Sequence, residues 1–320
     1  MTDNFTVKFW GVRGSYPAPG KGTVRYGGNT ACVEVRFGNR VLILDAGTGI
    51  IPLGRDLARR GQPLEVTLLL SHLHHDHTQG FPFFVPAYAP GTRLHIYGPG
   101  ASTETLEKVL EANQSPATFP VTLRDMAAAK DIRSLKESEM VVIGADGVSV
   151  TASGATVSED ALRVRILHSY AHPGGVYIYR IEWRGRSLVY ATDTEGYVGT
   201  DRKLVRFASG CDLLIHDAQY TEEHYRGALA GFPATQGYGH STAPMACEVA
   251  AAAGARTLVL FHHDPAYDDL MVAAAESAAR ALFTDVRAAA EGMEIALERP
   301  GALTLRKSAF ESHPANAGGR

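Results

Sequence analysis

The chain has 320 residues, and its 31 Lys or Arg against 34 Asp or Glu give a formal net charge of −3. This near balance excludes a strongly basic protein that wraps nucleic acid and an acidic disordered polymer. The hydrophobic content of 45% is that of a globular protein, which at this length can bury a sizeable core without disulfides.

Predicted strands occur along most of the chain. Short apolar runs rich in β-branched residues and mostly bounded by Gly, Pro or Asp are typical of strands. In chain order these runs are Thr6–Trp10, Ala31–Phe37, Val41–Asp45, Val66–Ser71, Leu94–Tyr97, Met140–Ile143, Leu162–Leu167, Val176–Trp183, Ser187–Ala191, Leu213–His216 and Thr257–Phe261.

Three helices are predicted, over Thr103–Asn113, Ala243–Ala253 and Leu270–Thr284. The second has Pro244 in its first turn and ends before Gly254, which are common helix boundary signals. Strand runs mixed with helices indicate an α/β fold.

The domain organisation follows from the absence of a Pro- or Ser-rich linker. We expect residues 1–307 to form one domain and residues 308–320 to be a flexible tail. The weakly periodic segment Ser115–Ser138 is predicted to be an irregular excursion between two halves of one core.

The cellular setting is inferred from cysteines and apolar runs. Cys32, Cys211 and Cys247 are widely spaced and suggest neither a disulfide framework nor a zinc ribbon. No signal peptide is visible, and no apolar run approaches the ~20 residues of a membrane span. We therefore expect a cytoplasmic protein without a membrane partner.

A dense group of potential metal ligands follows a predicted strand, where the run His72–His77 reads HLHHDH. In extended backbone, His72 and His74 project to the same side and can bind one ion. Asp76 and His77 lie where the chain turns into a helix and can face a second ion about 3.5–4 Å away. Imidazole and carboxylate ligands without a thiolate suit Zn, Mn or Fe.

This pattern resembles the metallo-β-lactamase superfamily over about residues 5–305. The resemblance implies that His172, in a His-Pro-Gly-Gly turn, completes the first metal site. It also implies that Asp193 bridges both ions and that His262 completes the second site. The implied fold is a four-layer αββα sandwich of two mixed sheets flanked by helices. The implied cofactors are two divalent metal ions, with Zn expected first and Mn or Fe as alternatives.

Two of these assignments have a neighbouring competitor. His168 is an alternative to His172, and His263 is an alternative to His262. Asp45, which follows another predicted strand, either orders the histidine loop from behind or simply ends a turn.

Two later segments indicate which branch of the superfamily this chain resembles. The segment with His216 and Asp217 resembles the His-Glu-Ala-Thr segment of ribonuclease Z, with Asp in place of Glu. Gly239–Thr242 resembles the Gly-His-Ser-Thr segment of the same enzymes and of the cyclic phosphodiesterase of phosphonate breakdown. The resemblance implies that Asp217 orients His240, which protonates the leaving alkoxide. With Asp76, these two are the candidate catalytic residues. The second segment is also suited to capping a helix, a role that is compatible with catalysis.

Two arginines lie in Gly-rich segments near the N-terminus. Arg13 and Arg25 either pair with a phosphate oxygen or belong to tight turns, and the sequence leaves both roles open.

The predicted function is hydrolysis of a small or cyclic phosphodiester or nucleotide through a hydroxide that bridges the two metals. The alternatives are a metal-dependent lactone or ester hydrolase and a non-catalytic nucleotide-binding protein. We expect no large nucleic acid as a partner, because the net charge is negative and no Gly- and basic-rich insertion is visible. A homodimer is possible.

Overall fold

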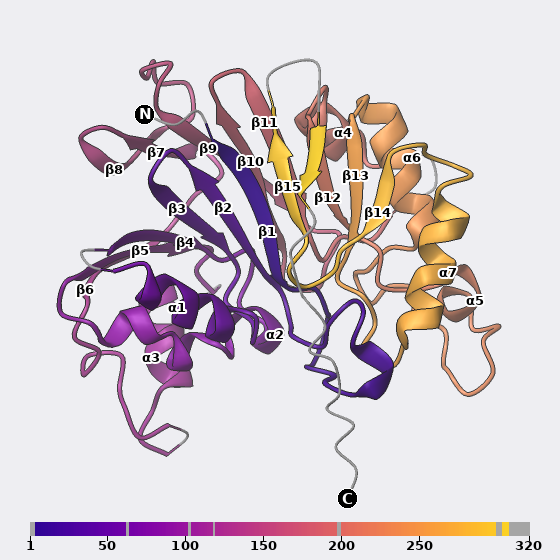
Figure 1. Ribbon diagram of the computed structural model, residues 1–320, viewed down its shortest axis with the longest axis horizontal. Coiled ribbons are helices and arrows are strands. Elements are labelled where there is room, and N and C mark those ends of the chain that lie inside the picture. Colours follow the sequence, from indigo (N-terminus) through magenta and orange to yellow (C-terminus); the bar gives the residue numbers. More distant parts are fainter. Residues whose placement is uncertain are drawn as a thin grey trace, which may run out of the picture.

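Two eight-stranded mixed sheets pack face to face in the computed structural model (Figure 1). The structure describes residues 4–61, 64–101, 104–117, 119–196, 200–298 and 303–306. The first sheet has the strand order β16-β15-β1-β2-β3-β4-β5-β6. Its strands are β1 (Phe5–Gly11), β2 (Cys32–Phe37), β3 (Arg40–Leu44), β4 (Leu64–Leu69), β5 (Thr92–Gly98), β6 (Ala129–Ser134), β15 (Glu294–Leu297) and β16 (Leu303–Arg306).

The second sheet has the order β14-β13-β12-β11-β10-β9-β7-β8. In each sheet a run of four neighbouring strands is parallel, β3 to β6 in the first and β11 to β14 in the second. The second sheet contains β7 (Glu139–Gly144), β8 (Gly147–Ala152), β9 (Leu162–Ser169), β10 (Val176–Trp183), β11 (Arg186–Ala191), β12 (Leu213–Asp217), β13 (Thr257–Phe261) and β14 (Val286–Ala288).

Helices cover the outer faces of both sheets (Figure 1). The first sheet is covered by α1 (Ile50–Arg59) and α3 (Leu106–Asn113), and the second by α4 (Arg202–Ala208), α6 (Ala243–Ala253) and α7 (Asp269–Ala279). The predicted four-layer αββα sandwich is therefore confirmed. Two short helices, α2 (His75–Thr78) and α5 (Glu222–Tyr225), complete the set of α-helices within the described ranges.

The central core lies between the two sheets. It combines inward-facing residues of the first sheet, such as Val7 and Val33, with residues of the second, such as Ile181 and Ile215. Every residue of β11, β12 and β13 is buried, because these strands carry the other sheet on one face and helices on the other.

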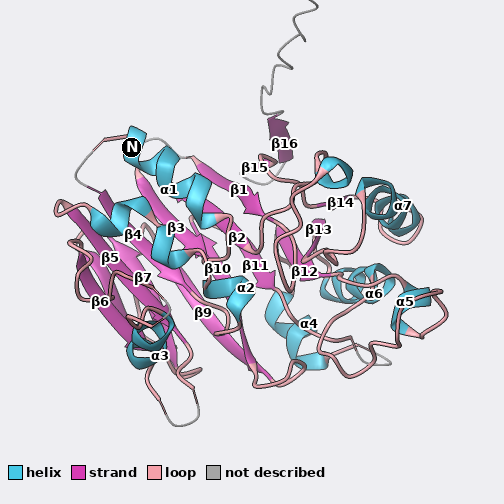
Figure 2. Ribbon diagram, turned by 90° about the horizontal axis from the view of Figure 1, so that it is seen from below, coloured by secondary structure: helices cyan, strands magenta, loops and turns pink. Residues whose placement is uncertain are grey.

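One edge of the sandwich collects many strand ends. The parallel strands β3 and β4 end at the same edge as β11, β12 and β13, and the loop from β9 to β10 lies there as well. Helix α2 lies at this edge, at the bottom in Figure 1 and near the middle of the view from below in Figure 2. In open α/β sheets, ligands bind outside the carboxyl ends of parallel strands.

The structure corrects some predicted elements. The segment Ser115–Ser138 is not irregular throughout, because Ala129–Ser134 forms β6 and pairs in parallel with β5. Its half-polar sequence is that of an edge strand and lacks apolar alternation. The last predicted helix ends at Ala279 rather than Thr284.

The start of the helix predicted from Thr103 and the tail 308–320 lie outside the described residues. Among the described helices, none combines the length and apolar character needed to cross a membrane.

Close backbone packing holds α2 against the turn after β3. The backbone N–H of Ala46 donates to His77 O at 2.8 Å, and that of Gly80 donates to Ala46 O at 2.9 Å. A Cβ atom on Gly80 would overlap the carbonyl oxygen of Gly47. Glycine is therefore required at position 80 because backbone, not a movable side chain, occupies the space.

We predict that Gly80→Ala lowers the free energy of unfolding by about 1–3 kcal/mol, because the added methyl group must push α2 away from the turn. The matched control is Gly154→Ala, since a Cβ there meets nothing within 4 Å. Urea denaturation of both variants checks this, and equal stabilities would contradict the packing argument.

Candidate metal centre

Most of the candidate site residues lie just after the ends of strands or on the short helix α2. His72 follows β4, Asp193 follows β11 and His262 follows β13, while Asp76 and His77 lie on α2. Asp193 and His262 have left-handed backbone, with φ of 49° and 67°, and Asp45 after β3 has φ of 63°. Non-glycine residues rarely adopt this conformation, and its concentration at functional sites is common.

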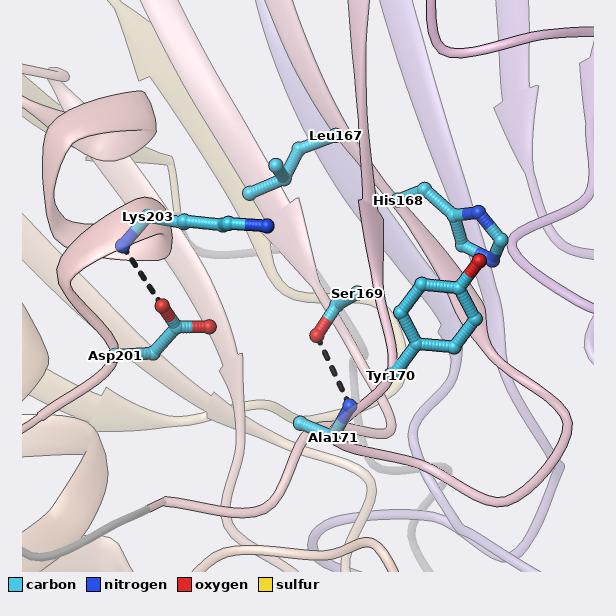
Figure 3. A pocket seen from close by; sticks show the side chains of 7 residues that line it. All are labelled: Leu167, His168, Ser169, Tyr170, Ala171, Asp201 and Lys203. Carbon is cyan, nitrogen blue, oxygen red and sulfur yellow. Dashed lines mark hydrogen bonds between the residues drawn. The ribbon is translucent and has the colours of Figure 1, made fainter.

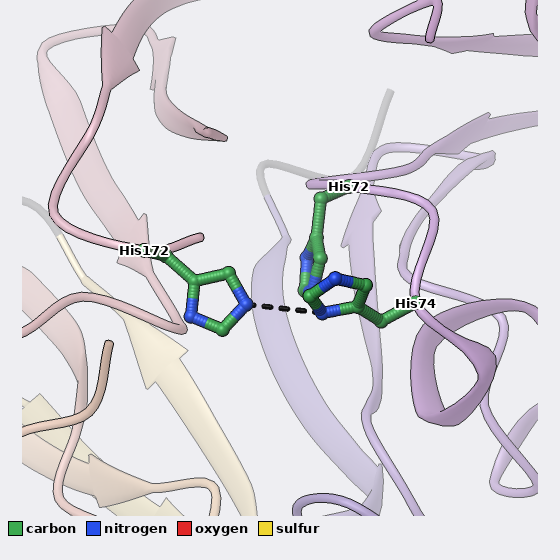
Figure 4. Close-up of side chains that lie close together, drawn as sticks. All are labelled: His72, His74 and His172. Atoms are coloured by element: carbon green, nitrogen blue, oxygen red, sulfur yellow. Dashed lines mark hydrogen bonds between the residues drawn. The ribbon is translucent and has the colours of Figure 1, made fainter. Parts of the chain in front are cut away.

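The first group of ligand atoms comes from three histidines (Figure 4). Nδ1 of His74 lies 3.0 Å from Nε2 of His72 and 3.0 Å from Nε2 of His172. Suitable ligand atoms of all three rings lie within 4.8 Å of one another. The structure therefore brings together the three residues that the sequence assigned to the first ion.

The second group contains Asp76, His77, Asp193 and His262, all buried. Nε2 of His77 lies 3.1 Å from Nε2 of His262, and Oδ2 of Asp76 lies 3.3 and 3.2 Å from these two nitrogens. These are the four residues assigned from sequence to the second ion.

Asp193 lies between the two groups. Its Oδ2 is 3.5 Å from Nε2 of His72 and 3.8 Å from Nε2 of His172. Its Oδ1 is 3.2 Å from Nε2 of His77 and 3.3 Å from Nε2 of His262. One carboxylate oxygen thus faces each group, which is the arrangement expected of a bridging ligand.

The other ring nitrogens fix the direction in which the lone pairs point. Nδ1 of His77 lies 2.8 Å from Oδ2 of Asp45, and Nδ1 of His262 lies 2.9 Å from Oε1 of Gln219. Both partners are acceptors, so each Nδ1 carries a proton, and in the neutral imidazole each Nε2 has a free lone pair. Two such lone pairs 3.1 Å apart repel each other unless a proton or a metal cation lies between them.

In the first group, too, Nδ1 of a histidine donates a hydrogen bond and Nε2 faces the site. Nδ1 of His172 donates to the carbonyl oxygen of Gly239 at 3.1 Å. The Ser71 hydroxyl donates to Asp45, so it accepts from Nδ1 of His72. Both Nε2 atoms therefore present lone pairs to the same nitrogen of His74. This donor set fits divalent metal ions and is a poor hydrogen-bond network by itself.

Charge balance supports the same conclusion. Four carboxylates, those of Asp45, Asp76, Asp193 and Asp217, are buried at this edge. Across the described part of the chain, every ion pair that they form is with a histidine. Buried negative charge without compensation is costly, so the cluster attracts cations.

The pKa values of His77, His72 and Asp193 are shifted by burial and by the charges of their neighbours. Burial alone would lower the pKa of His77, but the carboxylates of Asp193 and Asp76 raise it well above its ordinary value. Burial, followed by the charge on His77, lowers the pKa of His72 well below its ordinary value. Burial would raise the pKa of Asp193, but His262 and His77 hold it well below the usual range.

His240 and Asp217 form a pair beside the cluster. Nδ1 of His240 lies 2.8 Å from Oδ2 of Asp217, whose Oδ1 accepts the backbone N–H of Ser241 at 2.8 Å. Burial would lower the pKa of His240, but the charge of Asp217 raises it to about 9. Asp217 reaches His240 in spite of its short side chain. Thr242 caps α6 at the same time, so capping and the pairing coexist.

The competing histidines lie elsewhere. Nε2 of His263 donates to the carbonyl oxygen of Ala289 at 3.0 Å, and burial lowers the pKa of His263 to about 3. The ring of His168 lies against that of Tyr170, tilted by 39°, instead of joining the cluster. The geometry thus favours His262 and His172 as members of the site.

Arg13 does not face the site cavity. It is fully buried, and its guanidinium donates to the carbonyl oxygens of Gly27, Asp264 and Tyr267 at 2.7–3.0 Å. Its role is to tie the N-terminal loop to the loop after β13. Arg25 is exposed, and its guanidinium lies over the ring of Tyr26.

Several positioning groups were not singled out from sequence. The backbone N–H of Ser15 donates to Oδ2 of Asp76 at 2.7 Å. Gln219 fixes His262, and the hydroxyl of Tyr190 donates to Asp45 at 2.7 Å. Backbone donors carry no sequence signal, whereas Gln219 follows Asp217 by two residues at a strand end, a position that invites inspection.

Glu195 holds the loop that precedes His240. Its carboxylate accepts the backbone N–H groups of Gly237 at 2.8 Å and Gly239 at 3.0 Å, as well as the hydroxyl of Tyr225. Because the carbonyl of Gly239 also receives the proton of His172, this carboxylate links the two sides of the site.

The cluster opens into a cavity of about 360 Å³. This volume is at the small end of the range for ligand sites. The cavity is lined by Ser15, Leu73, His74, His75, Asp76, His172, Asp193 and His240.

Two stacked mixed sheets with buried imidazoles and carboxylates at one edge define the class as a metal-dependent hydrolase. The chain belongs to the β-lactamase superfamily, because the model of the Beta-lactamase superfamily domain matches residues 39–263. The fold of this family implies divalent metal ions, in agreement with the donor set.

Relatives agree with this assignment. Ribonuclease Z of Picrophilus torridus is 27% identical over 329 residues, which cover 93% of this chain and 98% of that protein. The metallo-β-lactamase fold protein YhfI from Bacillus subtilis has a TM-score of 0.63 at 19% identity, covering 92% of this chain and all of that one. Human tRNase Z, short form, has a TM-score of 0.61 at 19% identity with the same coverage.

The expectation that no large nucleic acid is a partner is wrong. Relatives that match nearly the whole chain are named ribonuclease Z, and a similar structure is a tRNase Z. A slightly negative net charge describes the whole surface and says little about one face, so it was a weak argument against RNA.

We predict that Asp193→Ala lowers the metal content of the purified protein to about half or less, because this carboxylate faces both groups. The control is His75→Ala, which removes an exposed imidazole of the same segment that belongs to neither group. Elemental analysis after chelation and reloading measures the content. A full complement in folded Asp193→Ala would contradict the bridging geometry.

Proposed function

We propose that the chain is a phosphodiesterase that uses two divalent metal ions. His72, His74 and His172 would hold one ion, and Asp76, His77 and His262 the other, with Asp193 shared between them. Zn is the expected metal, with Mn or Fe as alternatives. When bound, such a pair supplies a nucleophile at neutral pH and charge stabilisation for the phosphoryl oxygens.

The observation that carries the proposal is the pair of His240 and Asp217 beside the cluster. Asp217 accepts from Nδ1 of His240, which leaves Nε2 to carry a proton on a side chain that lines the cavity. The charge of Asp217 raises the pKa of His240 to about 9 in the metal-free cluster, which favours the protonated imidazole. An alkoxide leaves a phosphodiester poorly without a proton, so this acid suits phosphodiester cleavage.

The candidate substrate is a small or cyclic phosphodiester, which suits the modest volume of the cavity. RNA is the second candidate, and the names of the curated relatives favour it. In both cases a phosphodiester bond would be cleaved at the same site.

The direct test is an activity panel on metal-loaded protein. We expect hydrolysis of bis-p-nitrophenyl phosphate, and of a cyclic nucleotide or an RNA with a 3′ extension, with loss of activity on chelation and recovery on reloading. A panel of lactones separates the first rival. Turnover of lactones alone would replace the proposal by an ester hydrolase, and nucleotide binding without turnover would leave a binding protein.

We predict that His240→Ala lowers kcat by roughly 10²–10⁴-fold, the usual scale for general acid catalysis. Metal content should stay near that of the wild type, because His240 is assigned to proton transfer and not to either ion. Asp217→Asn should lower kcat in the same direction by weakening the orientation of His240. Loss of metal in His240→Ala would instead make this residue a ligand.

A further inference from the structure

Three aromatic rings, those of Tyr177, His168 and Tyr170, form a ladder from the core to the surface. Figure 3 shows the outer two, His168 and Tyr170. Tyr177 is buried, and its ring lies edge-on to that of His168 at 5.1 Å between centroids. His168 in turn lies 4.4 Å from the ring of Tyr170, which is 78% exposed. The sequence drew attention to His168 as a possible ligand, but the metal cluster does not use it.

A hydrogen bond at Tyr177 and the absence of a side chain at Gly175 fix the positions of the inner two rings. The hydroxyl of Tyr177 donates to the carbonyl oxygen of Leu135 at 2.8 Å. Gly175 has φ of 82°, and a Cβ on it would lie only 2.6 Å from Nε2 of His168. The glycine therefore leaves room for the imidazole that supports Tyr170. An exposed ring with two supporting rings is pre-positioned, which reduces the entropy lost on binding.

A cavity of about 160 Å³ lies next to this ladder. Its wall is formed by Leu167, His168, Ser169, Tyr170, Ala171, Asp201 and Lys203 (Figure 3). Oδ1 of Asp201 already accepts the backbone N–H of Lys203 at 2.7 Å, which caps α4. The cavity thus offers a ring face, an ammonium group, a hydroxyl and a carboxylate. Its one cation and one anion balance, which suits a neutral polar ring better than a phosphate.

This cavity lies close to the metal cluster along the chain. Ala171 lines it, and the next residue, His172, lines the cavity at the cluster. The Cα atoms of Tyr170 and His172 are at most about 7 Å apart, because only Ala171 lies between them. A ring attached to a phosphodiester at the cluster can therefore reach Tyr170.

We infer that Tyr170, supported by His168, is the stacking platform for a nucleobase next to the scissile phosphodiester. This rests on the proposed function and names its substrate class as a nucleotide or oligonucleotide. Bases of any sequence have a face that stacks on an aromatic ring, so the platform would contribute affinity with little base selectivity.

The test compares two substrates with the same leaving group, thymidine 5′-(p-nitrophenyl phosphate) and methyl p-nitrophenyl phosphate. In Tyr170→Ala, we expect KM for the nucleoside ester to rise by ~10-fold or more and KM for the methyl ester to change by less than about 2-fold. Tyr170→Phe keeps the ring and should behave as the wild type. Leu282→Ala, which removes an exposed side chain before the start of β14, is the surface control.

Equal effects of Tyr170→Ala on both substrates, or none on either, would overturn the inference. If the wild type cleaves neither ester, the phosphodiesterase proposal fails, and the platform is then judged by binding alone. Titration calorimetry with AMP should show binding to the wild type and weaker binding to Tyr170→Ala. No binding to the wild type, or equal binding to both, would overturn the platform as well.

Discussion

Four buried carboxylates and a set of converging imidazole lone pairs impose the constraint on which this edge of the molecule depends. Asp45, Asp76, Asp193 and Asp217 are buried at this edge, and among the described residues they form ion pairs only with histidines. Protonation of single imidazoles relieves part of the charge, as the raised pKa of His77 indicates. Divalent cations would relieve both the charge and the lone-pair repulsion, so the site is organised around positive charge that the side chains do not supply.

The fold satisfies this constraint through its strand ends. Parallel strands in both sheets finish at one edge, so residues far apart in sequence meet there without long loops. Left-handed backbone at Asp45, Asp193 and His262 turns these side chains inward, and each such residue costs about 1–3 kcal/mol. The close packing of Gly80 on Gly47 holds α2, and with it Asp76 and His77, against this edge.

Much of this was predictable from sequence because the signals are local. The run His72–His77 places four predicted metal ligands within six residues, and β10, β13 and α6 have the predicted bounds. The role of Arg13 was not predictable, because its partners are carbonyl oxygens brought close only by the tertiary fold. The polar edge strand β6 and the backbone donor at Ser15 likewise depend on neighbours that no local pattern reveals. The negative net charge was a poor guide to partners, because it averages over all faces of the molecule.

The central claim is that cations hold the two groups of ligand atoms together. Anomalous X-ray diffraction from crystals of metal-loaded protein, measured on both sides of the absorption edge of the metal, tests it most directly. The account predicts two peaks, one among His72, His74 and His172 and one among Asp76, His77 and His262, with Asp193 between them. Peaks elsewhere, or none at this edge of the sandwich under saturating metal, would contradict it.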